Sequence, residues 1–431
     1  MEWQVSGLIL MVLLFIALIS GVWVSVSLGI VGMVCLLLVD PSTMPAIGII
    51  VWDSTESFIL TAVPLFIFMG SIILESGVSG RFYRGLSLWL DFVPGSLAHS
   101  NIVACAIFAA ISGSSVATAA AIGSVAIPEM DGRGYDRRLT YGSLAAGGTL
   151  GILIPPSIIL IIYGAMVNES IGRLFIAAVI PGIILAGIFV FYIGFRTMIN
   201  PRLVPRSQVR ASWSKRFRGV LDVIPILALM ILVLGGIYLG MTTPTEAAAM
   251  GASGALLITA IYGQLSMGLL RKCLNDTVKI NSMVIFILVG AQIMSFALVT
   301  AGIPRGIVAL VTGIQTKPEV ILLLIWAVYL VLGCLMDALA MVLLTLPVVF
   351  PVIIAIGYDP IWFGVALVIM IEVAQITPPV GINLFVIQGI SKQPLSVVAW
   401  GAIPYAFLMM FMIGILMIFP QLALWLPAKM M

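Results

Sequence analysis

The sequence is poor in charge. Only 9% of its 431 residues are Asp, Glu, Lys or Arg, whereas 62% are hydrophobic. A soluble protein of this size needs many more charged side chains to cover its surface. A membrane-spanning helix needs about 20 mostly apolar residues, and such runs follow one another along most of the chain. The composition therefore excludes a soluble globular protein and predicts an all-α polytopic membrane protein.

Several kinds of chemistry lack the residues that they require. The sequence has a single histidine, His99, and no CxxC pair, so neither a zinc site nor an HExxH protease is expected. No GxxxxGK[ST] phosphate loop occurs, which argues against ATP binding by that route. Four cysteines stand singly and are interpreted as small core residues: Cys35, Cys105, Cys273 and Cys334. We expect neither an enzyme nor a nucleic-acid-binding protein.

The beginning of the chain does not resemble a cleavable signal peptide. Its first residues, MEWQVSG, contain no basic region and no A-x-A site, so we expect the first apolar run to be retained. That run, 5–39, is too long for one comfortable span and short for two at about 1.5 Å per residue. We favour two short helices.

The later apolar runs predict these membrane crossings: 57–77, 138–166, 172–197, 217–240, 244–263, 280–300, 360–390 and 396–427. Two further runs, 100–128 and 318–352, carry small or polar residues at their centres, ISGSSVATAA and LGCLMDALAM. They are either ordinary spans or re-entrant hairpins that turn back near the middle of the membrane.

The distribution of basic residues favours re-entrant hairpins. If both runs turn back, sixteen of the twenty Lys and Arg residues lie on one side, which is then cytoplasmic. If 100–128 crossed completely, the basic groups at 81–84 and 133–138 would face opposite sides. The short loop 40–56 contains acids and no Lys or Arg, as expected on the external side.

Prolines and glycines indicate an internal repeat. A shift of 223 residues pairs the following features: Pro128 with Pro351, Gly134-Tyr135-Asp136 with Gly357-Tyr358-Asp359, Pro155-Pro156 with Pro378-Pro379, and Pro181 with Pro404. Chance similarity between apolar segments is the alternative, but prolines mark helix breaks rather than composition. Five predicted crossings separate the start of 57–77 from the start of 280–300. Because five is odd, the second copy is predicted to be inverted, as in secondary transporters.

Both Pro-Pro pairs lie inside runs long enough to cross the membrane, GGTLGILIPPS and EVAQITPPVGINL. Such a pair removes two N–H donors and breaks the preceding helix. Irregular backbone at membrane depth survives only where it lines a cavity or packs within protein. One break is also typical of a kinked helix. Two breaks at equivalent places, each facing a polar hairpin tip, favour a binding site built from helix ends.

The two hairpin tips and the second break offer hard oxygen ligands, which suit sodium. The first tip, 112–115 with Thr118, carries hydroxyls and carbonyls, and the second tip carries Asp337. The second break adds Gln375, Thr377 and Asn383, with Glu372 one turn earlier. The alternatives are that Ser and Thr only hold helices together and that Glu372 is protonated or paired within the bundle. No Lys or Arg lies deep in a predicted span, so an anionic substrate would be held by helix N-termini, hydroxyls and co-bound cations.

Two amphipathic segments, 80–92 and 304–316, occupy the same place in each copy. Their Trp and Arg residues suit helices that lie in the membrane interface. We interpret them as arms that join a moving body to a fixed one, with simple connecting loops as the alternative.

Three long motifs now identify a family resemblance: AAISGSSVATAAAIGSVAIPEM, GGTLGILIPPSIILIIYG and EVAQITPPVGINLFVIQG. Over nearly the whole chain the sequence resembles the large membrane subunit, DctM type, of the tripartite ATP-independent periplasmic (TRAP) transporters. The resemblance implies sodium-driven import of an organic acid, such as a C4-dicarboxylate or sialic acid, across the bacterial inner membrane. It implies two partners, a small DctQ-type membrane subunit of about four helices and a DctP-type periplasmic solute-binding protein. No small-subunit segment precedes the first run, so that partner is expected to be a separate polypeptide.

The resemblance also implies an elevator mechanism and a set of site residues. A transport domain of about 98–166 plus 318–390 would slide against a scaffold. At least two sodium ions are expected, with these ligands: Ser112, Gly113, Ser114, Gly151, Pro155, Asp337, Gln375 and Thr377. The predicted substrate-binding residues are Ser114, Ser115, Thr118, Thr149 and Asn383. The predicted division of the chain is 1–56 (scaffold helices), 57–199 (first repeat), 200–279 (basic loop and connecting scaffold helices) and 280–431 (second repeat).

Three other functions share some of these sequence features. A stand-alone ion-coupled carboxylate symporter of similar design would need no binding protein. An intramembrane aspartyl protease is suggested by the two GYD triplets, but these lie on opposite sides and no GxGD accompanies them. A passive channel fits poorly, because broken helices and closed hairpins build occluded sites.

Overall fold

The computed structural model describes residues 2–91, 93, 95–205, 212–313, 316–333 and 336–430. Within these residues the protein consists of helices and contains no strand, as the composition predicts. Cys35, Cys105 and Cys273 are buried and free, which confirms their interpretation as core residues. Cys334 lies outside the described residues.

The N-terminal part forms α1 (Trp3–Ile19), α2 (Val24–Val39) and α3 (Ala46–Glu56). The prediction of two short helices over 5–39 is therefore confirmed. The prediction of a loop over 40–56 is wrong, because its second half is α3. Pro45 has a φ of −61°, which suits a helix start, and an apolar run without further proline follows it.

The rest of the chain is described by its helices in order. Those of the first predicted repeat are α4 (Ala62–Glu75), α5 (Val78–Ser87), α6 (Ser96–Ser112), α7 (Ser115–Gly132), α8 (Arg137–Leu153), α9 (Ile158–Val167) and α10 (Ile171–Ile199). Two connecting helices follow, α11 (Trp213–Tyr238) and α12 (Pro244–Ile261). Those of the second predicted repeat are α13 (Met267–Thr300), α14 (Ile303–Gly313), α15 (Pro318–Gly333), α16 (Ala338–Ala355), α17 (Pro360–Gln375), α18 (Ile382–Ser391) and α19 (Leu395–Ile418), and α20 (Gln421–Met430) ends the chain.

Both halves contain the same succession of elements. A helix is followed by a short amphipathic helix, a helical hairpin, an interrupted helix and a long helix. The interruptions lie at 154–157 and 376–381, where the two Pro-Pro pairs were expected to break the helices. The amphipathic segments are the helices α5 and α14 rather than loops. That the second copy is inverted stays a prediction.

Two predicted boundaries are wrong. The span predicted at 280–300 begins at Met267, so the boundary between 279 and 280 falls inside α13. Ser266 accepts the Leu269 N–H and starts this helix in a charged segment that hydropathy does not mark. The span predicted at 396–427 is two helices, because Pro420 cannot continue α19.

Seven helical stretches of the described residues are long and apolar enough to cross a membrane: Phe58–Glu75, Arg137–Val167, Ile171–Ile199, Trp213–Tyr238, Met267–Thr300, Ala338–Ala355 and Leu395–Ile418. The length and composition of these helices are those of a multi-pass membrane protein. One of these stretches is α16, an arm of the second hairpin. Length and composition do not separate a re-entrant arm from a span, so re-entrance stays a prediction.

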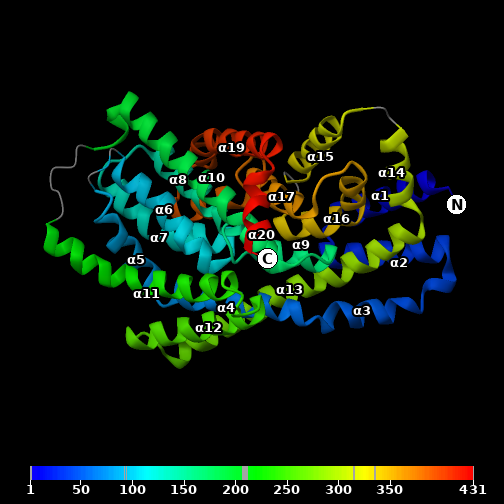
Figure 1. Cartoon of the computed structure of the whole chain (residues 1–431), viewed down its shortest axis with the longest axis horizontal. Coiled ribbons are helices and arrows are strands. Elements are labelled where there is room, and N and C mark those ends of the chain that lie inside the picture. The colour runs from blue at the N-terminus through cyan, green and yellow to red at the C-terminus, as the bar shows by residue number, and fades with distance from the viewer. Residues whose placement is uncertain are drawn as a thin grey trace.

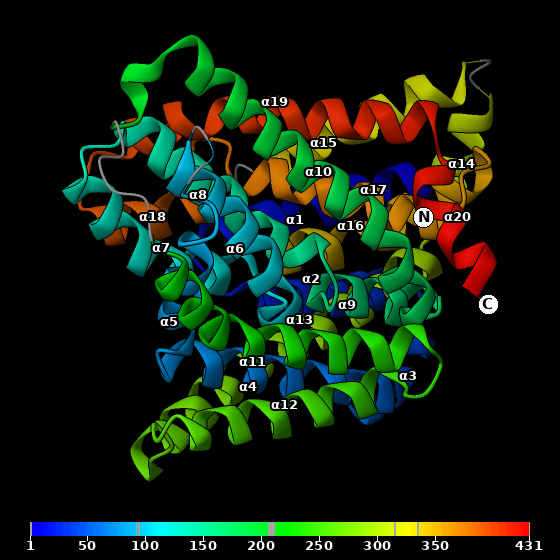
Figure 2. The ribbon, with the colours of Figure 1, turned by 60° about the vertical axis from the view of Figure 1, so that its left-hand side comes forward.

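The centre of the molecule is formed by the two interrupted helices. Every residue of α8 from Leu139 to Leu153 is buried, and so is every residue of α17 from Ile361 to Gln375. Helices α6, α7 and α19 pack on α8, and α15 and α19 pack on α17. In both views α3, α4 and α12 lie on one side of the molecule and α19 lies on the opposite side (Figures 1 and 2).

Candidate functional site

The tip of the first hairpin is held by its own hydroxyl groups. Helix α6 ends at Gly113, whose φ of +59° turns the chain back, and Ser114 caps α7 by accepting the Ala117 N–H at 3.4 Å. The Thr118 hydroxyl donates to the Ser114 carbonyl oxygen at 2.8 Å and lies 2.6 Å from the Ser112 hydroxyl. Oxygen atoms therefore gather at a turn that contains no charged side chain.

This tip packs directly against the first helix break. The Ile158 N–H points to the Gly113 carbonyl oxygen at 3.4 Å, and a Cβ on Gly113 would lie 2.9 Å from the Pro156 oxygen. A Cβ on Gly151 would lie 2.5 Å from the Ser114 carbonyl oxygen. The predicted pairing of the first tip with the first break is therefore present, and glycine is required on both sides of the contact.

The second hairpin meets the second break in a similar way. Asp337 caps α16, and its carboxylate accepts the Leu339 N–H at 3.1 Å. A Cβ on Gly333 would collide with the side chain of Ala374, which places the end of α15 against the end of α17. The Thr377 hydroxyl donates to the Val373 carbonyl oxygen at 2.6 Å within the break.

A cavity of about 710 Å³ connects both tips and both breaks. The hairpins and breaks line it with Ser112, Gly113, Ser114, Ser115, Val116, Ala117, Ala120, Ile152, Ile158, Ile159, Asp337, Ala338, Leu339, Gln375 and Ile382. Helices α4 and α13 form the rest of its wall. The first residues of α7, α9, α16 and α18 all belong to this lining, so four helix N-termini converge on one space. Free N–H groups and the helix dipole make such ends favourable for anions.

Six of the predicted site residues line the cavity: Ser112, Gly113, Ser114, Ser115, Asp337 and Gln375. Thr118 and Gly151 lie directly behind the first tip. Pro155, Thr149, Thr377 and Asn383 are not part of the lining. Thr149 is buried and its hydroxyl donates to the Ala146 carbonyl oxygen of its own helix at 2.8 Å. Asn383 is also buried, and its amide donates to the Ala145 carbonyl oxygen at 3.2 Å, which ties α18 to α8.

The cavity wall includes charged residues that sequence reasoning missed. Glu75 of α4 and Asp276 and Lys279 of α13 line it, and Lys272 forms an ion pair with Glu75 at 2.5 Å. Asp276 and Lys279 were missed because the predicted span began at residue 280. The signal available was their helical spacing, since Asp276, Lys279 and Met283 follow one another at i, i+3 and i+7 on one helix face.

Buried polar side chains with unpaired oxygens lie on both sides of the second break. Glu372 is fully buried, and neither of its carboxylate oxygens has a hydrogen-bond partner among the described residues. One amide oxygen of Gln375 and one of Asn383 are likewise unpaired there. Buried polar oxygens normally have partners, so these four oxygen atoms are candidates to receive a cation or a proton. No group of three His, Cys, Asp or Glu residues in the described part of the chain is arranged to hold a metal ion. The oxygen atoms available to a cation there belong to carbonyl, hydroxyl and amide groups and to individual carboxylates.

Comparison with known proteins gives one family. Residues 10–422 match the family model described as "Tripartite ATP-independent periplasmic transporter, DctM component". The C4-dicarboxylate TRAP transporter large permease protein DctM of Pseudomonas aeruginosa is 37% identical over 93% of this chain and 93% of that protein. The sialic acid TRAP transporter large permease protein SiaM of Vibrio cholerae is 30% identical over 95% of this chain and 96% of that protein. The 2,3-diketo-L-gulonate TRAP transporter large permease protein YiaN of Escherichia coli is 31% identical, and the match covers 88% of each.

Two solved structures share the fold. The YdaH transporter of Alcanivorax borkumensis superimposes with a TM-score of 0.63 over 89% of this chain and 88% of that chain, at 13% sequence identity. MtrF of Neisseria gonorrhoeae gives a TM-score of 0.53 over 91% of this chain and 85% of that chain, at 12% identity. At these identities the similarity concerns the fold alone.

Proposed function

Because the chain belongs to the DctM component family of the tripartite ATP-independent periplasmic transporters, we propose that it is the permease through which an organic acid is imported by sodium symport. Because the family consists of transporter permeases, we propose a transport function rather than an enzymatic one. Three of the relatives are named for C4-dicarboxylates, sialic acid and 2,3-diketo-L-gulonate. All three are carboxylate-bearing compounds, so a small organic acid is the substrate class that we propose for this chain.

The observation that carries the proposal is the single cavity at which both hairpin tips and both helix breaks meet. The C-terminal ends of α6 and α8 lie at it and would supply carbonyl oxygens, and Ser112 and Ser114 would add hydroxyls. Asp337 adds one carboxylate, which a bound cation would neutralise at membrane depth. These are the hard ligands that sodium prefers, with Gly151 allowing close approach of the first break.

The same cavity supports an anionic substrate. Four helix N-termini end at it with the positive ends of their dipoles, and sodium ions bound at the tips would add positive charge. Ser114 and Ser115 would donate hydrogen bonds to the carboxylate. Among the described lining residues Lys279 is the only cationic side chain, and it follows Arg271 and Lys272 on α13, which the charge distribution predicts to be on the cytoplasmic side. We therefore propose that this conformation opens towards the cytoplasm.

For the movement we propose an elevator of two inverted repeats, 57–199 and 280–431 (with α13 starting earlier, at Met267). The transport body would consist of the hairpins and broken helices, α6–α9 and α15–α18. Helices α4 and α13 would belong to the scaffold, so that the cavity lies between the two bodies. The similar succession of elements in the two halves supports this division.

We propose that the chain works in the bacterial inner membrane with a small DctQ-type subunit and a DctP-type binding protein. An isethionate TRAP transporter permease protein named DctMQ, from Oleidesulfovibrio alaskensis, is 32% identical over 91% of this chain, yet the match covers only 62% of that protein. The extra length of that relative supports a second membrane component in the working transporter.

Reconstitution tests the proposal. Proteoliposomes containing this chain and its candidate small subunit are given radiolabelled succinate or sialic acid with a candidate binding protein outside. We expect uptake under an inward sodium gradient and none when potassium replaces sodium. Uptake by this chain alone, without either partner, would instead establish a stand-alone symporter. Uptake that is indifferent to sodium would refute the coupling.

A further inference from the structure

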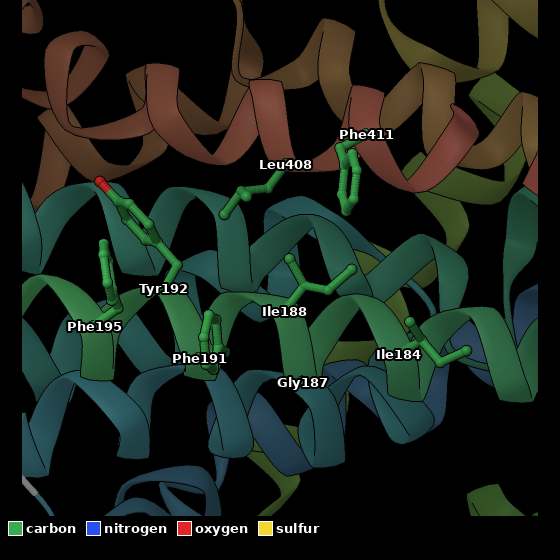
Figure 3. A pocket seen from close by; sticks show the side chains of 8 residues that line it. All are labelled: Ile184, Gly187, Ile188, Phe191, Tyr192, Phe195, Leu408 and Phe411. Atoms are coloured by element: carbon green, nitrogen blue, oxygen red, sulfur yellow. The ribbon is translucent and has the colours of Figure 1, made fainter. Parts of the chain in front are cut away.

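A second cavity lies on the outer surface of the helix pair α10 and α19, away from the candidate site. Its volume is about 500 Å³, and eight residues line it: Ile184, Gly187, Ile188, Phe191, Tyr192, Phe195, Leu408 and Phe411. Figure 3 shows the α10 side chains along one wall and Leu408 and Phe411 reaching down from α19. We call it the α10–α19 groove. Its lining is apolar except for the Tyr192 hydroxyl.

The groove faces outward rather than into the protein. The exposed fractions of Phe191, Phe195 and Phe411 are 74%, 57% and 62%. Both helices are among those long and apolar enough to cross a membrane. The surroundings of these aromatic rings are therefore the hydrocarbon layer.

The length of the groove matches one leaflet. Eleven residue steps from Ile184 to Phe195 correspond to about 16 Å at about 1.5 Å per residue. Half of the hydrocarbon core is about 15 Å thick. A single extended acyl chain that enters at the Phe195 end would thus reach the bilayer centre near Ile184.

A positive charge stands at the end where a lipid headgroup would lie. Arg196 follows Phe195 directly, donates to the Tyr192 hydroxyl at 3.0 Å, and its guanidinium carbon lies 5.9 Å from the Tyr192 ring centroid. Tyr192 is held in turn against the Tyr405 ring, with the ring centroids 5.1 Å apart. None of the ion pairs among the described residues involves Arg196. A guanidinium has five N–H donors, so most remain for a phosphate oxygen.

We propose that the α10–α19 groove binds one anionic phospholipid of the cytoplasmic leaflet, with an acyl chain along the groove and the headgroup on Arg196. Planar N–H donors suit a lipid phosphate, and the aromatic walls give an acyl chain more contact than an even helix surface would. The site is independent of the transport cavity. The assignment to the cytoplasmic leaflet follows from the excess of basic residues at this end of α10.

Two variants separate the groove from the headgroup contact. At Gly187 a Cβ would meet no atom within 4 Å, so Gly187→Phe starts its side chain in open space and projects a ring into the groove. Its matched control is Gly414→Phe on α19, because a Cβ there also meets nothing within 4 Å and Gly414 does not line the groove. Arg196→Gln removes the charge, Arg196→Lys keeps it, and Lys215→Gln removes an exposed cation elsewhere on the same side.

Native mass spectrometry of the full chain, co-expressed with its candidate small subunit, measures lipid retention. The probes are phosphatidylglycerol and phosphatidylcholine with identical acyl chains. We expect the unmodified chain to retain phosphatidylglycerol about fivefold better, as one basic residue at a membrane surface provides. Arg196→Gln should abolish this preference, whereas Arg196→Lys and Lys215→Gln should keep it. Gly187→Phe should reduce retention of both lipids, and Gly414→Phe should not.

Three results would overturn the proposal. The first is equal lipid retention by the Gly187→Phe and Gly414→Phe variants. The second is an unchanged lipid preference in Arg196→Gln. The third is loss of the small subunit from Gly187→Phe with lipid retention intact, which would identify the groove as a helix-docking site. Melting temperatures within a few degrees of the unmodified chain establish that each variant is folded, and the Gly187→Phe and Gly414→Phe pair still tests the proposal if Arg196→Gln is not folded.

Discussion

Replacing Gly151 by alanine tests the contact between the first hairpin tip and the first break. A Cβ at this position would lie 2.5 Å from the Ser114 carbonyl oxygen and 2.6 Å from the Thr118 hydroxyl oxygen. Both oxygens belong to the tip at which we propose that sodium binds. A single methyl group therefore acts on the ion site without changing any polar atom.

The size of the effect follows from the overlap. Carbon and oxygen atoms approach to about 3.3 Å in the closest ordinary contacts, so the tip must move by about 0.8 Å. Overpacking of this kind costs about 1–3 kcal/mol. If about 1.4 kcal/mol of this cost falls on the ion-bound arrangement, sodium affinity drops about tenfold.

The assay is sodium-dependent uptake in proteoliposomes containing the small subunit and the binding protein. We expect Gly151→Ala to raise the sodium concentration for half-maximal uptake about tenfold, at unchanged orientation and amount of protein. Gly389→Ala is the control, since it makes the same substitution on α18 where a Cβ meets no atom within 4 Å. The melting temperature without sodium measures the structural cost separately.

An unchanged sodium requirement in folded Gly151→Ala protein would refute the reasoning. It would mean that the tip can move without disturbing the ion, and hence that Ser112, Ser114 and Thr118 do not form the sodium site. A lower melting temperature of Gly151→Ala, with normal sodium dependence of uptake, would likewise mean that these residues do not form the sodium site.

Three further predictions concern the cavity. Asp337→Ala, or Ser114→Ala together with Ser115→Ala, should raise the half-maximal sodium concentration for uptake in the same assay by about tenfold or more; an unchanged sodium titration would contradict their role as ligands. Lys279→Gln should raise the half-saturating substrate concentration about threefold, because a partly exposed charge contributes less than about 1 kcal/mol to binding. The Lys215→Gln control and the sodium titration should stay unchanged. An unaltered substrate curve would mean that Lys279 does not contact the substrate. Ser114→Cys should react with a membrane-impermeant maleimide from the cytoplasmic side and more slowly when sodium and substrate are present, whereas labelling from the periplasm in every condition would mean that 100–128 crosses the membrane.

The positions of the breaks and tips were predictable because proline and glycine act locally. A proline pair ends a helix whatever surrounds it, and the turn at Gly113 needs a φ that glycine adopts readily. The interrupted helices at 154–157 and 376–381 therefore follow from the residues themselves. Chain breaks at two equivalent places also indicated that the tips and breaks would share one site.

Side-chain direction was less accessible to sequence reasoning. Asn383 and Thr149 lie in the expected segments, but their helices turn them to Ala145 and Ala146 rather than to the cavity. The rotation of a half-helix on either side of a break depends on packing with distant elements, which no local pattern encodes. Lys279 was missed for a different reason, because α13 extends beyond its apolar part and hydropathy registers only that part.

The glycines at the helix contacts have a consequence for the route of the ion. Gly151, Gly148 and Gly333 bring the hairpins so close to the broken helices that even a methyl group would meet its neighbour at less than a normal contact distance. At these three contacts the gap between the hairpin and the broken helix is too narrow for a carbon atom, and therefore too narrow for a water molecule. If sodium binds at the tips as we propose, it would have these close contacts on one side and the cavity beside α4 and α13 on the other. Closing that cavity would then decide on which side of the membrane the ion is released.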